Sequence, residues 1–346
     1  MKNNKVLIAV VAAVVVIAVV LGVVLLGGGS ANQEYKLGMG AVAGDHNASQ
    51  TNLTVATVVT DANGKILACR IDVAQNKYSV VEGEVTFSNL KTKMELGDAY
   101  GMAGKVDNNG DGVKLEWYEQ VKAFEKYVVG KTAAEVAAMT TKVANNHNIS
   151  TDDALLNAGC TIDIVDLRDA VVKACNDEQG MTFAAVDSFK LGLGINSAND
   201  GSAADDEENY TIKLNVEFAA SVVVDGKIVA TVNDAYQPNI TVEDGDVVSA
   251  TVGTFAGKAD KNNTFMTKRE LKETYGMKAA AIDKNGDGKS EEWYVQSAAY
   301  SAHVVGKTGS EVAGLFTAGD DLLSAGCTIY IGGISTVVAE SVTNAR

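Results

Sequence analysis

The amino-acid sequence predicts an α+β fold: two tandem copies of one module, preceded by one N-terminal transmembrane helix. Three observations support this prediction. The chain opens on a long apolar run, a set of motifs occurs twice in the same order, and within each copy strand patterns precede helix patterns. Strands followed by helices are typical of α+β domains, in which helices pack on an antiparallel sheet.

Residues 1–31 are predicted to be a membrane anchor or a signal peptide. An unbroken apolar run extends from Val6 to Leu26, and GGGSANQ follows it. As a helix, these 21 residues would span roughly 32 Å, enough for a bilayer core of about 30 Å. A secretory signal needs a shorter apolar region and small residues at a cleavage site, and Gly29 and Ala31 would serve there. Both interpretations remain open.

The distribution of basic residues predicts the orientation of this segment. Lys2 and Lys5 precede the apolar run, and the next basic residue is Lys36. Positive charges favour the cytoplasmic side, so residues 32–346 are expected outside the cell. We therefore expect a single-pass protein of the cell membrane with an extracellular bulk, or a secreted protein if the segment is cleaved.

Composition restricts the partners and the cysteine chemistry. The net charge is −15, with 44 acidic and 29 basic residues, whereas a nucleic-acid-binding protein needs a basic surface. We expect no nucleic-acid partner. The cysteines, Cys69, Cys160, Cys175 and Cys327, are far fewer than in disulfide-built secreted domains. Buried free thiols are the default expectation, although the sequence also allows a Cys160–Cys175 disulfide.

The rest of the chain consists of two similar repeats. Repeat 1 covers residues 35–178 and repeat 2 covers residues 186–345, and the linker NDEQGMTFAAVDS is short enough that the two should touch. The period exceeds the roughly 20–50 residues of solenoid repeats, so tandem domains are expected. The matching segments are YKLGMG (35–40) with FKLGLG (189–194), KTKMELGDAYGM (91–102) with MTKRELKETYGM (266–277), VDNNGDGVKLEWYEQ (106–120) with IDKNGDGKSEEWYVQ (282–296), VVGKTAAEVAAM (128–139) with VVGKTGSEVAGL (304–315), and AGCT at 158–161 with AGCT at 325–328.

The first half of each repeat is predicted to be a β-hairpin. TNLTVATVVTDANGKILACRIDV (51–73) alternates apolar and polar residues around Asn63-Gly64, a strong hairpin-turn signal. The counterpart in repeat 2, residues 210–234, turns at Asp225-Gly226. Each hairpin should form the basis of an antiparallel sheet.

The second half of each repeat is predicted to be helical. One apolar face of residues 117–128 is formed by Trp117, Val121, Phe124 and Val128. Gly130 suits the position just after the helix end. Thr132 with Glu135, and Thr308 with Glu311, have the spacing of a capping box. IVDLRDAVVKA, after the first AGCT, also has helical spacing and should pack on the sheet.

DNNGDG (107–112) and DKNGDG (283–288) resemble the start of a calcium-binding loop, in which oxygen ligands alternate before a glycine. The candidate metal ligands are Asp107, Asn109, Asp111, Asp283, Asn285 and Asp287. The twelfth position of such a loop normally carries a bidentate Glu, but Tyr118 and Tyr294 stand there. A turn rich in Asn, Asp and Gly is the alternative.

With these motifs, each repeat resembles the FMN-binding domain family, extracytoplasmic modules of membrane electron-transfer systems in anaerobic Gram-positive bacteria. In that family, a flavin transferase joins the FMN phosphate to a Thr in a [ST]-G-A-[TS] motif. AGCT occupies the equivalent place. The resemblance therefore implies that Gly159 and Thr161, and Gly326 and Thr328, bind the cofactor, with Ala and Cys at the other two positions of the motif.

Two functions follow as alternatives. In the first, the modules carry FMN for extracellular electron transfer with a redox partner, and the protein is an electron carrier rather than an enzyme. In the second, it is a non-catalytic cell-envelope binding or structural protein with degenerate modules, stiffened by calcium. AGCT would then be a strand-to-helix corner in which Thr161 or Thr328 caps the following helix, since a helix start needs such a polar side chain.

Overall fold

The computed structural model describes residues 33–44, 46–104, 107–108, 110–112, 114–255, 265–278, 290–317 and 319–346. The predicted N-terminal span lies outside these residues. Among the helices of the described part of the chain, none is both long and apolar enough to cross a membrane.

Repeat 1 contains an antiparallel five-stranded sheet in the order β4-β3-β2-β1-β7, with helices, so the predicted α+β class is confirmed. Its strands are β1 (Glu34–Ala43), β2 (Gln50–Thr60), β3 (Ile66–Val81), β4 (Glu84–Asn89), β5 (Thr141–Ala144), β6 (His147–Ser150) and β7 (Met181–Ala184). Its helices are α2 (Lys93–Leu96), the 3₁₀ turn η1 (Gly97–Tyr100), α3 (Trp117–Val128), α4 (Ala133–Ala137), α5 (Asp153–Asn157) and α6 (Val165–Cys175).

Repeat 2 is built around a long central strand, β10, which pairs with β8 and β11 and, near its start, with β9 and β12. Its strands are β8 (Lys190–Asn199), β9 (Ala203–Ala204), β10 (Tyr210–Val224), β11 (Lys227–Tyr236), β12 (Pro238–Glu243) and β13 (Asp246–Val252). Its helices are α7 (Lys268–Leu271), the 3₁₀ turn η3 (Lys272–Tyr275), α8 (Trp293–Val304), α9 (Gly309–Ala313), α10 (Asp320–Ser324) and α11 (Gly332–Thr343).

The predicted hairpin turns and capping boxes are confirmed. Gly64 (φ +74°), Asp225 (φ +50°) and Gly226 (φ +78°) adopt the left-handed conformation that tight hairpin turns require. The predicted apolar face of α3 is its buried face, and Gly130 follows the helix at φ +85°. Thr132 and Thr308 form complete capping boxes at the starts of α4 and α9.

Four residues of the predicted linker belong to a sheet. Residues 181–184 form β7, which pairs antiparallel with β1 from Glu34↔Ala184 to Leu37↔Met181. The sheet of repeat 1 therefore extends beyond the predicted boundary at residue 178. MTFA is too short to show strand alternation in sequence, and it forms a strand because the free edge of β1 offers hydrogen-bonding partners.

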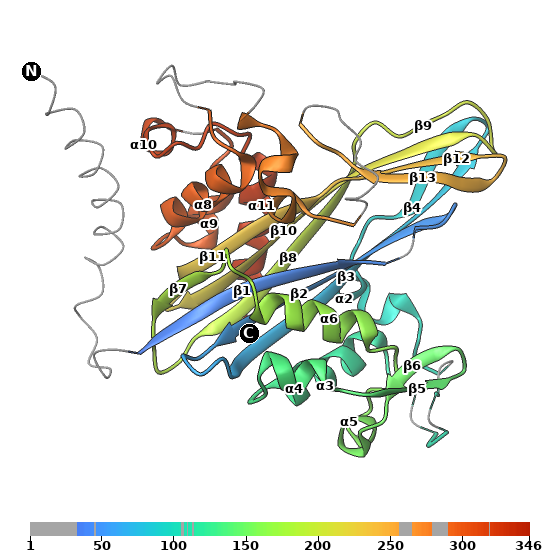
Figure 1. Cartoon of the computed structure of the whole chain (residues 1–346), viewed down its shortest axis with the longest axis horizontal. Helices are drawn as coiled ribbons and strands as arrows, with labels where there is room; N and C mark the ends of the chain where they lie inside the picture. Colours follow the sequence, from blue (N-terminus) through green and yellow to red (C-terminus); the bar gives the residue numbers. More distant parts are fainter. Residues whose placement is uncertain are drawn as a thin grey trace, which may run out of the picture.

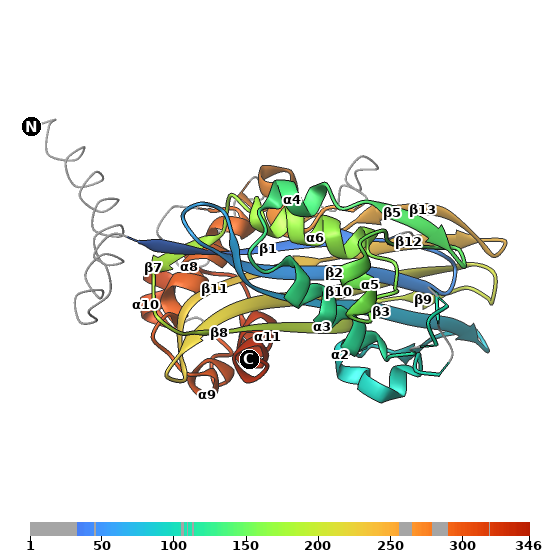
Figure 2. The same ribbon diagram turned by 90° about the horizontal axis from the view of Figure 1, so that it is seen from below.

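The two sheets pack against each other and the helices cover their outer faces, so the two repeats form four layers (Figures 1 and 2). In Figure 1, α8, α9 and α11 lie on one side of the strands and α3, α4 and α6 on the other. Strand β3 contacts β8, and β1 contacts β10 and β11. One hydrophobic core joins Leu37 and Val55 of repeat 1 to Leu193 and Phe218 of repeat 2. The predicted contact between repeats is thus a shared core.

Glycines in the repeated LGxG motif position the last helix of each repeat. A Cβ on Gly38 would lie 2.0 Å from the carbonyl oxygen of Ala174 in α6, and a Cβ on Gly192 would lie 1.8 Å from that of Ser341 in α11. Side chains alternate along a strand, so the neighbouring Leu37 points to the other face and enters the shared core. The motif therefore places a helix on one face of the strand and the second sheet on the other.

Two ion pairs also join the repeats, one buried and one with an exposed arginine. Nη2 of Arg269, in α7, lies 3.1 Å from the Asp177 carboxylate, which follows α6, and the Asp177 carboxylate also accepts the N–H of Met39. At the other end of the interface, Arg346 lies 2.8 Å from the Glu125 carboxylate in α3. Each pair connects the end of one repeat to the body of the other.

We expect Gly192→Ala to lower the free energy of unfolding by about 3 kcal/mol, because the added Cβ would overlap the main chain of α11. Urea unfolding of the chain outside the N-terminal segment measures this change. Gly314→Ala is the matched control. Its Cβ would meet no atom closer than 3.6 Å and its φ is −81°, so it should change stability by less than about 1 kcal/mol. Equal effects of the two substitutions would contradict the packing argument.

A second prediction concerns pH. Glu340 in α11 stands where α6 carries Lys173, and Lys173 forms an ion pair with Glu270 across the interface. Burial, and then Glu95 and Asp72, raise the pKa of Glu340 to about 7. A carboxyl whose pKa is raised on folding stabilises the fold at low pH, and this stability is lost as pH rises through about 7.

Glu340→Lys should therefore raise the free energy of unfolding at pH 8 by about 1 kcal/mol, after allowance for solvent screening, and by less at pH 5. Glu340→Gln should flatten the pH dependence between 5 and 8. Unfolding midpoints at the two pH values measure both effects. A Gln variant with the parental pH dependence would refute the role of Glu340.

Candidate functional site

Each AGCT segment is the end of a short helix. After α5, Gly159 adopts φ +91° and donates its N–H to Leu156 O, and Cys160 donates to Leu155 O at 3.2 Å. After α10, Gly326 (φ +89°) and Cys327 make the same bonds. This pair of bonds is the Schellman motif, which requires a left-handed residue and therefore favours Gly.

The predicted strand-to-helix corner is therefore wrong. AGCT connects two helices, and neither Thr caps the second one, since α6 begins at Val165 and α11 at Gly332 without a side-chain cap. The preceding helices were not predicted because five residues are too few to show an apolar periodicity.

The two Thr residues instead bind a buried glutamine of the Trp helix. Gln120 Oε1 accepts the N–H of Thr161 at 2.9 Å and its hydroxyl at 3.2 Å. In repeat 2, Gln296 accepts the same two groups of Thr328 at 2.7 and 3.0 Å. Thr161 is 2% exposed, whereas Thr328 is half-buried. The two hydroxyls therefore differ in accessibility.

The same glutamine also contacts the YGM segment of its repeat. Gln120 Nε2 lies 3.5 Å from the sulfur of Met102, and Gln296 Nε2 lies 3.2 Å from that of Met277. We call each arrangement of Gln, Thr and Met a glutamine node. The nodes explain why three distant motifs recur together, since YGM, EWYxQ and AGCT meet at one buried point in each repeat.

A lysine that lies over two aromatic rings is found beside each node, and we call it a caged lysine. No sequence motif predicted this arrangement. Lys93 Nζ lies 5.2 Å from the ring centre of Tyr100 and 5.3 Å from that of Trp117. Lys268 has the same two distances to Tyr275 and Trp293. Such placement is favourable because aromatic faces attract cations. Burial lowers the pKa of Lys93 to about 8. The only sequence signal was the repeated T-K-x-E-L pattern.

The candidate calcium loop lies next to the first AGCT. Asn108 donates to Thr161 O at 2.7 Å, while the Asp107 carboxylate accepts the N–H groups of Gly110 and Gly112. Within the described residues, no cluster of three or more His, Cys, Asp or Glu side chains is placed to hold a metal ion. Calcium binding stays a prediction, because four of its candidate ligands lie outside those residues, namely Asn109, Asp283, Asn285 and Asp287.

The four cysteines are free, and no disulfide joins Cys160 to Cys175. Cys69, Cys160 and Cys327 are buried as expected, whereas Cys175 is half-buried. Burial raises the pKa of the Cys160 thiol to about 12, so little of the reactive thiolate forms at neutral pH. The cysteine of AGCT is therefore a packing residue.

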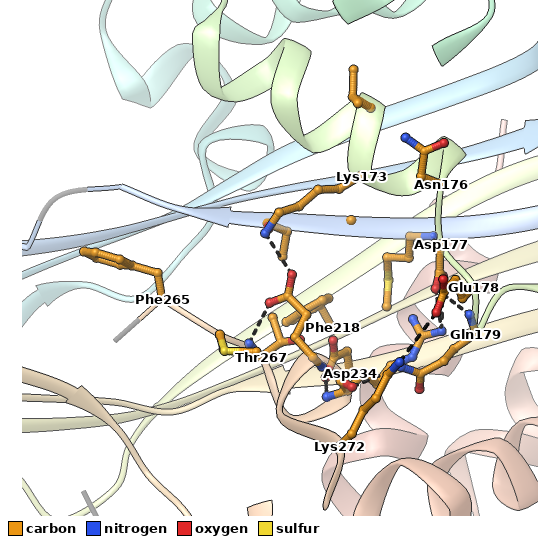
Figure 3. A pocket seen from close by; sticks show the side chains of 17 residues that line it. Lys173, Asn176, Asp177, Glu178, Gln179, Phe218, Asp234, Phe265, Thr267 and Lys272 are labelled. Carbon is orange, nitrogen blue, oxygen red and sulfur yellow. Dashed lines mark hydrogen bonds and ion pairs between the residues drawn. The ribbon is translucent and has the colours of Figure 1, made fainter. Parts of the chain in front are cut away.

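A cavity of about 860 Å³ lies at the interface between the two repeats (Figure 3). Lys173 and Asp177 border it from repeat 1, and Phe218, Phe265 and Arg269 border it from repeat 2. Burial raises the pKa of Asp234, also in its wall, to about 7. Its volume is within the usual range of small-molecule sites. No sequence motif predicted it, because it exists only where the repeats meet.

Comparison with known proteins gives one partial similarity. No family model matches the chain, and no solved structure matches it. A chlorophenol reductase of Desulfitobacterium hafniense is 32% identical over 120 residues, which cover 29% of this chain and 35% of that protein. The chain thus matches about a third of that relative's length.

We expect Gln120→Leu to lower the free energy of unfolding by about 1–3 kcal/mol, because the buried N–H of Thr161 would lose its acceptor. Chemical unfolding measures the loss. Gln33→Leu, at an exposed glutamine, is the control and should change stability by less than about 0.5 kcal/mol. A Gln120 variant as stable as this control would show that the node carries no stability.

Proposed function

We propose that this chain is a membrane-anchored extracytoplasmic protein whose two FMN-binding-like modules carry flavin for extracellular electron transfer. The observation that carries the proposal is the 32% identity over 120 residues to a protein named as a reductase. The motif resemblance of both repeats to the FMN-binding family agrees with it. The partners would be the membrane, a redox protein and a flavin transferase.

The geometry supports different roles for the two candidate attachment residues. Both hydroxyls are bonded to a glutamine, that of Thr161 to Gln120 and that of Thr328 to Gln296. Thr161 is 2% exposed, so a transferase would have to open this segment first, whereas Thr328 is half-buried and therefore the more accessible residue. If flavin is attached covalently, we expect repeat 2 to carry it.

Flavin held without a covalent bond would need a cavity, and the one between the repeats has suitable size and lining. Phe218, Phe265 and Met39 offer apolar surface to a flavin ring, and Lys173 and Arg269 offer positive charge. Bound flavin would supply the redox chemistry, while these residues would position it and exclude water.

The second candidate is a non-catalytic cell-envelope protein with degenerate modules, stiffened by calcium. Specific support comes from the AGCT segments, whose main-chain N–H groups are used within each module. Gly159 and Cys160 close a helix, and Thr161 binds Gln120, so these donors have structural partners.

The proposal predicts flavin absorbance near 450 nm in the protein purified from its native host. Absorbance that stays with acid-precipitated protein, and is lost in Thr328→Ala but retained in Thr161→Ala, is the expected result for covalent flavin. Release into the supernatant would mean non-covalent flavin. A colourless protein that gains no absorbance from added FMN would refute electron transfer by flavin and favour the envelope protein.

A further inference from the structure

A second, smaller cavity of about 190 Å³ lies between β11, α8 and the start of β7. Several of the residues that line it are polar and buried. Asn233 is 1% exposed, and Ser297 and Ser301 are each 3% exposed. Arg269, 7% exposed, is the only charged side chain among the described residues that line it.

The fold does not require polar side chains at two of these positions, as repeat 1 demonstrates. The strand register aligns Asn233 of β11 with Ile71 of β3. Asn233 pairs with Ala219 of β10, and Ile71 pairs with Ala56 at the equivalent place in β2. Counting from the shared Trp, Ser297 aligns with Val121, and both are fully or almost fully buried. At these two positions repeat 1 carries apolar side chains. The polar side chains of Asn233 and Ser297 therefore serve another purpose.

In repeat 1 the corresponding space holds a carboxylate and a guanidinium. Glu125, which aligns with Ser301, accepts the N–H of Ile71 at 2.8 Å and pairs with Arg346 at 2.8 Å. Gln179 and Arg346 stand at equivalent positions, because each follows the AGCT segment of its own repeat by the same number of residues. In repeat 2, the side chain of Gln179 donates to Arg269 O and, among the described residues, bonds to no carboxylate. Ser301 is shorter than Glu125, and the space that the longer side chain would fill is the cavity.

Hydrogen-bond donors remain around the cavity. The N–H of Ala235 points away from the sheet and donates to Asp234 Oδ1, as the N–H of Val73 does to Asp72 Oδ1 in repeat 1. N–H groups two residues apart on a strand point in the same direction, so the N–H of Asn233 also points out of the sheet edge. The Ser301 hydroxyl accepts from Asn233 Nδ2, and within the described residues its own hydrogen has no acceptor.

The Arg269 guanidinium adds positive charge. Only its Nη2 contacts Asp177, and Nε and Nη1 bond to none of the described residues. Asp177 borders the larger cavity and not this one. Guanidinium, hydroxyl and main-chain N–H groups are the usual partners of an oxyanion.

We propose that this cavity is an oxyanion-binding site, which takes the carboxylate or phosphate group of a small ligand in the place that the Glu125 carboxylate fills in repeat 1. Arg269, Ser301 and the N–H of Asn233 bind the anion. Arg269 and Gln179 also border the 860 Å³ cavity, so the anion is either a free ion or the charged end of a larger molecule that extends between the repeats.

The test is thermal unfolding of the full chain in inorganic phosphate, acetate, FMN or riboflavin, with ionic strength held constant by sodium chloride. We expect a saturable rise in Tm of about 3 °C at ten times the Kd of a binding anion. Phosphate or acetate alone raising Tm would identify a free ion. If FMN raises Tm and phosphate, acetate and riboflavin do not, the bound anion is the charged end of a larger ligand.

Ser301→Glu is the decisive variant, because it supplies the repeat 1 carboxylate within the cavity. It should raise Tm without any ligand and abolish the response to anions. Ser310→Glu makes the same charge change at an exposed position of α9 and should retain the response.

The site is refuted if no anion raises Tm, if riboflavin acts as strongly as FMN, or if Ser301→Glu responds as the parent does. These outcomes are separate from the flavin test. A colourless protein that responds to phosphate keeps this site and loses only the proposed electron transfer.

Discussion

The architecture depends on the close approach of a helix to the first strand of each repeat. Gly38 and Gly192 leave no room for a Cβ against α6 and α11, so a helix lies directly on the strand backbone. The opposite face of the same strand carries large apolar side chains, which must be buried elsewhere. The sheet of the other repeat covers them. One local packing constraint thus determines both the outer and the inner layers.

Because the inner faces share one core, the two repeats are halves of a single structure. The strand β7 and the ion pairs Asp177–Arg269 and Glu125–Arg346 reinforce this union. Both cavities described above border the region where the repeats meet. Duplication of a module has therefore produced features that neither copy would have alone, and a ligand there would contact both repeats.

The repeats have kept their structural motifs and diverged around them. The glutamine nodes and caged lysines occur in both with closely similar distances. At two positions of the helix-to-sheet layer, the aliphatic Ile71 and Val121 of repeat 1 are replaced in repeat 2 by Asn233 and Ser297, which bond to each other. Divergence in buried positions, where polar groups are costly to place, is a stronger indication of function than the conserved motifs themselves.

The sequence by itself determined the duplication, the α+β class, the hairpin turns and the capping boxes, because these depend on neighbouring residues such as Asn63-Gly64 and Thr132. It also located AGCT, but not its role, since a five-residue helix shows no periodicity. Only the tertiary structure decided that the sheets share a core, that Thr161 meets Gln120, and that Arg269 borders a cavity. These facts depend on residues far apart in the chain, whose contacts arise only when the layers pack.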